Sequence, residues 1–144
     1  MDILSKEERS QRMSAVRSTG NRSTEWKLRA ALVRHGISGW KMHARWLPGV
    51  PDFVFPKLHV AIFIDGCFWH SCPHCNRPLP KANRAYWSSK LKFNIAQAKR
   101  VNRVLRQNGI KVIRIWEHEV RNSQSLDSLL PKLFSSHKRS KVQR

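Results

Sequence analysis

The stretch that decides the fold is Ile62-Phe63-Ile64-Asp65-Gly66-Cys67-Phe68-Trp69-His70. Its apolar first half is typical of a strand that is buried on both faces, and this strand ends at an acid followed by a glycine. A second short strand is expected just upstream, in Pro51-Asp52-Phe53-Val54-Phe55. Because only a short turn separates the two strands, they predict a hairpin that brings Asp52 and Asp65 to nearby points.

Helices and strands alternate in the rest of the chain. The first expected helix begins with a capping box and has few large apolar residues, so we expect it to dock weakly or to order on binding. The order α-α-β-β-β-α-β-α predicts an α/β fold in which helices flank a mixed central sheet. The expected helices span residues 6–17, 23–35, 84–108 and 125–134, and the strands span residues 40–45, 52–55, 59–64 and 110–116.

The composition indicates a polyanionic partner. The chain has 28 Lys and Arg residues against 9 Asp and Glu residues, which gives a formal net charge of +19 and a pI near 11.3. That surplus exceeds what solubility requires and is typical of proteins that bind nucleic acid. A protein that binds nucleic acid by charge alone, without catalysis, would have the same surplus of positive charge. The sequence contains no long apolar segment, which disfavours a membrane as the partner.

The length of 144 residues suits one domain with a substantial core. We expect residues 1–22 to form an N-terminal arm, residues 23–135 the catalytic domain and residues 136–144 a basic tail. Residues 1–18 are polar and charged, unlike a secretory signal. We therefore expect a protein of the cytoplasm or nucleoid, where thiols stay reduced.

Two acids and a histidine beside the central strands predict a metal-dependent phosphodiesterase. Mg²⁺ prefers oxygen ligands, so Asp52 and Asp65 at the ends of neighbouring strands are its candidate ligands. His70 is the candidate proton acceptor, because an imidazole can take a proton from water near neutral pH. Each acid taken alone would also suit a turn or cap residue, and His70 would also suit a zinc ligand.

A cysteine cluster predicts a structural zinc site. Cys67, Cys72 and Cys75 supply three thiolates, and a structural Zn²⁺ ion takes four nitrogen or sulfur ligands. The fourth ligand is either His118 or His74. His118 is favoured, because it would tie a distant element to a proline-rich loop that has little core of its own. Free buried thiols are the alternative.

Three aromatic residues lie near these groups. Phe68 and Trp69 fall on a loop rather than on an apolar periodic face, and Trp87 lies near the start of the helix that follows. Apolar side chains of this kind can wedge between base steps and open a duplex. Loop core is the alternative for the first two, and helix core suits Trp87 equally well.

Four segments of the chain closely resemble the very short patch repair (Vsr) mismatch endonucleases, and the similarity spans residues 10–121. The resemblance implies a restriction-endonuclease-like, PD-(D/E)xK-related fold with a structural zinc site. It also implies Mg²⁺-dependent nicking of one DNA strand, 5′ to the thymine of a T:G mismatch. The segments are Pro51-Asp52-Phe53-Val54, Phe63-Ile64-Asp65-Gly66-Cys67-Phe68-Trp69-His70, Asn83-Arg84-Ala85-Tyr86-Trp87 and Ile115-Trp116-Glu117.

The resemblance assigns roles by position. Asp52 matches the Mg²⁺-binding aspartate, and His70 matches the histidine that activates water. Glu25 matches an acid that supports the site from the second helix. The other matches are the aromatic wedge Phe68, Trp69 and Trp87, the minor-groove intercalator Met13, and the zinc ligands Cys67, Cys72, Cys75 and His118.

The chain departs from the family pattern in three respects. Asp65 stands where well-known members have a second active-site histidine, which implies metal binding by two carboxylates here. At the zinc site, Cys72 replaces a histidine and His118 replaces a cysteine, so each position keeps a nitrogen or sulfur donor. Ala98 stands where some members have an acid.

Two other functions use the same features. A restriction-type endonuclease on this fold would cut an unmismatched site, but intercalation is costly and useful mainly where pairing is already weak. A zinc-stabilised DNA-binding module without catalysis would leave Asp52 and Asp65 without a purpose.

Since T:G mismatches arise when 5-methylcytosine deaminates, a cytosine-5 DNA methyltransferase is implied as a functional partner. A single-strand nick needs only a monomer.

Overall fold

The computed structural model describes residues 22–139, with side chains described for residues 23–134. The helix expected over residues 6–17, and Met13 within it, lie outside the described residues. The described part contains a four-stranded sheet with helices, which confirms the predicted α/β class. Within it, no helix is both long and apolar enough to cross a membrane.

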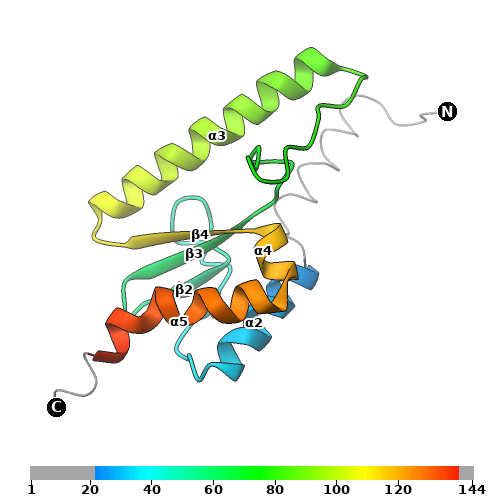
Figure 1. Ribbon diagram of the computed structural model, residues 1–144. Coiled ribbons are helices and arrows are strands. Elements are labelled where there is room, and N and C mark those ends of the chain that lie inside the picture. The colour runs from blue at the N-terminus through cyan, green and yellow to red at the C-terminus, as the bar shows by residue number, and fades with distance from the viewer. Residues whose placement is uncertain (1–21, 140–144) are drawn as a thin grey trace.

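A mixed sheet forms the centre of the fold (Figure 1). Its strands, in their order across the sheet, are β1 (Lys41–Met42), β2 (Phe53–Phe55), β3 (Val60–Asp65) and β4 (Lys111–Trp116). Strands β1, β2 and β3 pair antiparallel, and the predicted hairpin places Phe53 opposite Ile62. Strands β3 and β4 run parallel, with Asp65 opposite Trp116. Such a pair requires a long crossover connection.

Helices cover both faces of the sheet (Figure 1). The crossover between β3 and β4 contains α3 (Arg84–Gln107), which lies over one face. On the opposite face lie α2 (Arg22–Arg34) and α5 (Ser123–Arg139). The short helix α4 (Glu117–Arg121) follows β4 directly.

Strand β3 contributes to two apolar cores because its side chains alternate between the faces of the sheet. Val60 and Ile62 belong to the core on the side of α2 and α5, whereas Ala61 and Phe63 pack with α3. The strand is therefore buried on both faces, as its apolar sequence predicted. The larger core also contains Leu28, Ala31, Leu32, Phe53, Phe55, Ile113, Ile115, Val120, Leu126, Leu130 and Phe134.

Two elements differ from those predicted. The strand expected over residues 40–45 is only two residues long, because His43 adopts a φ of 51° and leaves the extended conformation. The acidic segment after β4 forms the first turn of α4. There the Glu119 Oε1 atom accepts a hydrogen bond from the Trp116 N–H at 3.2 Å, which caps the helix.

Gly49 offers a test of how closely the loop between β1 and β2 packs on α3. Its φ is +75°, and a Cβ atom there would lie 2.7 Å from the Val101 Cγ1 atom. We expect Gly49→Ala to lower the free energy of unfolding by about 2–4 kcal/mol, since left-handed strain adds to overpacking.

Gly36→Ala is the matched control, because Gly36 has a φ of +68° and would place a Cβ atom in open space. Strain alone predicts a loss of about 1 kcal/mol for this variant. Urea denaturation measures both losses. Equal losses would contradict close packing at Gly49.

Candidate active site and metal centre

Two carboxylates and an imidazole meet beside the sheet. Glu25 lies in the first turn of α2, His43 directly follows β1 and Asp52 directly precedes β2. One potential ligand atom from each residue lies within 4.8 Å of the other two, a spacing that suits a shared metal ion. Glu25 is only 5 % exposed, whereas the His43 side chain is half exposed, so the group is open to solvent on the His43 side.

Hydrogen bonds fix the three side chains. The Asp52 Oδ2 atom accepts a bond of 2.7 Å from the Ile64 N–H, which ties this carboxylate to β3. The His43 Nε2 atom lies 2.9 Å from the Glu25 Oε1 atom. The His43 N–H donates to the Asp52 carbonyl at 3.1 Å and so extends the β1–β2 pairing toward the site. Contacts within the protein therefore position all three side chains.

Burial raises the pKa of Asp52 from its ordinary 3.8 to about 7. The Ile64 N–H opposes this shift by stabilising the charged form, and the negative charge of Glu25 adds to it. Two carboxylates held together away from water repel each other when both are ionised. A divalent cation between them would remove that cost, so the electrostatics of the group favour a hard cation.

Asp65 is not part of this group and has different partners. The carboxylate is 8 % exposed, and its Oδ1 atom accepts a hydrogen bond of 2.8 Å from Arg114 Nη1. The same oxygen lies 3.8 Å from the His70 Nε2 atom. Asp52 and Asp65, which the sequence predicted as joint ligands, thus belong to two clusters: one with Glu25, the other with His70.

Arg114 is itself fixed from several sides. It lies on β4 opposite Phe63, and its guanidinium carbon is 4.2 Å from the centre of that ring. The Arg114 Nε atom donates to Asn102 Oδ1 on α3 at 2.7 Å. Because these contacts come from β3 and α3, the guanidinium holds Asp65 in a defined position next to His70.

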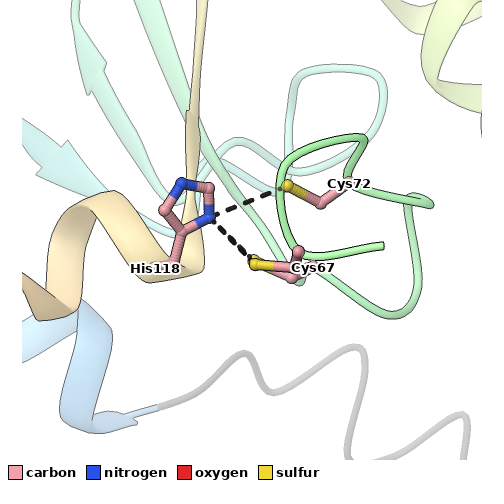
Figure 2. Close-up of side chains that lie close together, drawn as sticks. Cys67, Cys72 and His118 are labelled. Atoms are coloured by element: carbon pink, nitrogen blue, oxygen red, sulfur yellow. Dashed lines mark hydrogen bonds between the residues drawn. The ribbon is translucent and has the colours of Figure 1, made fainter. Parts of the chain in front are cut away.

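The three cysteines and a histidine form a second cluster that could bind a metal ion. Figure 2 shows His118, at the start of α4, pointing toward Cys67 and Cys72 on the loop that follows β3. The Nδ1 atom of His118 lies 3.3 Å from Cys67 Sγ, 3.7 Å from Cys72 Sγ and 3.4 Å from Cys75 Sγ. All four ligand atoms lie within 4.8 Å of one another.

These distances fit four ligands around one ion. Sulfur at about 2.3 Å and nitrogen at about 2.0 Å from a tetrahedral ion would lie about 3.5 Å apart. Without an ion, burial raises the pKa of the Cys67 thiol to about 11, so a cation is needed to make it a thiolate at neutral pH. Of the two candidate fourth ligands, His118 belongs to the cluster. The His74 ring contacts the His118 ring edge-on, with ring centroids 5.9 Å apart.

The three aromatic residues predicted as a wedge form one cluster. The ring centroids of Phe68, Trp69 and Trp87 are 5.4–5.7 Å apart in each pair, and all three side chains are partly exposed. The Asn94 side chain on α3 donates to the Trp69 carbonyl at 3.2 Å and anchors the loop to this helix. The cluster is thus a partly exposed apolar surface supported by α3.

Comparisons with known proteins identify the family of this chain. A family profile described as "DNA mismatch endonuclease Vsr" matches residues 1–77. This chain belongs to the Vsr family. The type II nicking enzyme V.NaeI from Lentzea aerocolonigenes is 44 % identical over 77 % of this chain and 68 % of its own. The type II nicking enzyme V.XorIIP from Xanthomonas oryzae pv. oryzae is 36 % identical over 90 % and 93 %. The Escherichia coli DNA mismatch endonuclease Vsr is 31 % identical over 87 % and 79 %.

Membership of the Vsr family makes the chain a DNA endonuclease with the nuclease fold of that family. Sequence reasoning missed two residues of its sites. His43 was assigned to the middle of a strand, although a histidine so close to Pro51-Asp52 in the sequence was a usable signal. Arg114 was missed because it lies in a strand of alternating apolar and polar residues, where a basic residue is normally solvent-exposed.

The metal cluster yields a matched pair of variants. We expect the purified protein to contain one tightly bound metal ion. His118→Ala should lose this ion, because only three of the four ligands then remain. His74→Ala should keep the ion, although its ring contacts His118. Elemental analysis after dialysis measures the metal content. Retention by His118→Ala together with loss by His74→Ala would show that His74 is the fourth ligand.

Proposed function

We propose that this protein nicks one strand of double-stranded DNA on the 5′ side of the thymine in a T:G mismatch. The observation that carries the proposal is the grouping of Glu25, His43 and Asp52 in a member of the DNA mismatch endonuclease Vsr family. Relatives named type II nicking enzymes support cleavage of a single strand. The relative from Escherichia coli, named a DNA mismatch endonuclease, supports the mismatch as substrate.

Mg²⁺ is the proposed catalytic ion, and Asp52 and Glu25 are its proposed holders. Both offer carboxylate oxygens, which Mg²⁺ prefers over imidazole nitrogen. His43 therefore serves to orient Glu25 through their 2.9 Å contact. When bound, the ion polarises the phosphoryl oxygen and lowers the pKa of the attacking water.

His70 is the proposed acceptor of the proton from that water. Its Nε2 atom faces Asp65 at 3.8 Å, and its side chain is 23 % exposed, so the ring is held by the protein while remaining partly accessible. The sequence suggested Asp65 as a second Mg²⁺ ligand. The 2.8 Å contact with Arg114 favours a positioning role instead, because that oxygen is already paired with a cation.

The aromatic cluster is the proposed mismatch reader. Phe68, Trp69 and Trp87 would wedge between base steps from one groove, and Met13, which lies outside the described residues, would insert from the minor groove. Unstacking costs least where pairing is already weak, so such a wedge selects mismatched DNA. Lys and Arg side chains supply the affinity for phosphate.

Zn²⁺ is the proposed ion of the Cys67, Cys72, Cys75 and His118 cluster, because it prefers four nitrogen or sulfur ligands in tetrahedral geometry. All four positions are occupied by protein side chains, which is typical of a structural rather than a catalytic ion. There it would join the loop after β3, which carries Phe68 and Trp69, to the end of β4.

Two alternatives use the same geometry. A restriction-type endonuclease on this fold would cut a matched sequence, and a DNA-binding module would not cut at all. The partly exposed aromatic cluster favours mismatch recognition over the first. The closely grouped carboxylates of Glu25 and Asp52 oppose the second, because anions repel DNA unless a cation lies between them. A monomer suffices, and a cytosine-5 DNA methyltransferase is the proposed functional partner.

Strand-resolved cleavage tests the proposed reaction. End-labelled duplexes with a T:G pair or a C:G pair are incubated with Mg²⁺ or with EDTA. We expect a Mg²⁺-dependent nick in the thymine strand only, and a loss of at least about 10³-fold in rate for Asp52→Ala with DNA binding retained. Equal cutting of both duplexes would favour the restriction-type nuclease.

Asp65→Asn separates positioning from metal binding. We expect a fall in kcat of about 10- to 100-fold with Mg²⁺ affinity unchanged, because the variant leaves Glu25 and Asp52 intact but weakens the hold on His70. Asp52→Asn is the matched control and should lose Mg²⁺ affinity. Titration calorimetry without DNA measures the affinity. A weakened affinity in Asp65→Asn would show that Asp65 is a ligand.

A further inference from the structure

The loop between β1 and β2 carries a feature that the proposed chemistry does not use. This loop, residues 43–52, begins at His43 and ends at Asp52. Both of its ends therefore belong to the cluster of Glu25, His43 and Asp52. Hydrogen bonds of 3.1 Å and 3.2 Å continue the strand pairing into the loop, from the N–H groups of His43 and Ala44 to the carbonyls of Asp52 and Pro51. The base of the loop therefore has a fixed conformation.

The rest of the loop is also held firmly. Ala44 is fully buried, and Leu47 packs against the core beneath α3. Gly49 approaches Val101 so closely that no side chain would fit between them. Val50 has a φ of 49°, a conformation that is strained for a β-branched residue and persists only where the surroundings impose it. The loop is thus a rigid platform rather than an adaptable segment.

This platform presents an exposed tryptophan. Trp46 is 63 % exposed and Val50 is 44 % exposed. The Lys41 ammonium lies 6.0 Å from the Trp46 ring centre, and Arg45 beside it is also exposed. An aromatic face flanked by cations is the combination that binds nucleic acid, since the ring packs against bases or sugars while the cations contact phosphates.

We propose that Trp46 packs against a nucleotide of the DNA substrate next to the cleaved phosphate, given that cleavage occurs at the Glu25, His43 and Asp52 group as proposed above. The chain length between Trp46 and His43 is only three residues, so the ring cannot lie far from that group. The contact is separate from the aromatic cluster of Phe68, Trp69 and Trp87, which α3 and the cysteine loop support. Two separate surfaces of the protein would therefore contact the DNA: the aromatic cluster at the mismatch and Trp46 beside the cleaved phosphate.

Charge identifies DNA as the partner of this surface. Lys41 and Arg45 would repel a second copy of this chain, whose formal net charge is also +19. A polyanion is attracted to the same cations.

Equilibrium binding without cleavage tests the contact. A fluorescein-labelled duplex with a T:G pair is titrated with each protein in buffer without added Mg²⁺, and anisotropy reports binding. We expect Trp46→Ala to weaken binding about tenfold and Trp46→Phe to restore most of it, because the aromatic face is what packs. The slope of log Kd against log salt should stay unchanged in Trp46→Ala and should fall by about 1 in Arg45→Ala.

Val33→Ala is the control, because Val33 is 62 % exposed on α2 and should have no effect. Wild-type affinity in Trp46→Ala would overturn the proposal. So would an unchanged affinity accompanied by a change in oligomeric state on sedimentation, which would assign the surface to self-association. If the wild type fails to cut in Mg²⁺ while Trp46→Ala still binds about tenfold more weakly, the proposed reaction fails and the DNA contact stands.

Discussion

The parallel pairing of β3 and β4 is the constraint on which the functional groups depend. Asp65 and Trp116 are the last paired residues, so Cys67 and His118 each lie two positions beyond the end of their strand. Parallel strands end at the same edge of a sheet, and this is why two residues so distant in sequence contribute to one cluster that could bind a metal ion. The loop that carries the aromatic cluster starts at that edge.

Among the described residues, the acids of the two sites are buried or partly buried, and each has a different partner for its charge. Asp65 is paired with Arg114 at 2.8 Å, and Glu25 contacts His43 at 2.9 Å. Asp52 relies on a backbone N–H and faces the negative Glu25, which with burial raises its pKa to about 7. The carboxylate with the least compensation is therefore the one that a divalent cation would stabilise most.

The remaining surface combines positive charge with exposed aromatic rings at two separate places. The cluster around Trp87 is supported by α3, and Trp46 is presented by the rigid loop between β1 and β2. Positive charge alone provides affinity that depends on salt and not on sequence. Rigid aromatic contacts add position, because a ring that is already fixed loses little entropy on binding. Together they suit the proposed mismatch endonuclease, which would have to find a rare mismatched pair and hold one phosphate at its site.

The sequence by itself determined the β2–β3 hairpin, the α3 helix and the grouping of Cys67, Cys72 and Cys75, because these follow from local periodicity and spacing. Only the tertiary structure decided that His43 joins Glu25 and Asp52, and that Asp65 pairs with Arg114. Those partnerships join side chains from different elements. They depend on strand register, on the φ of 51° at His43 and on how α2 and α3 pack against the sheet, none of which a local pattern encodes.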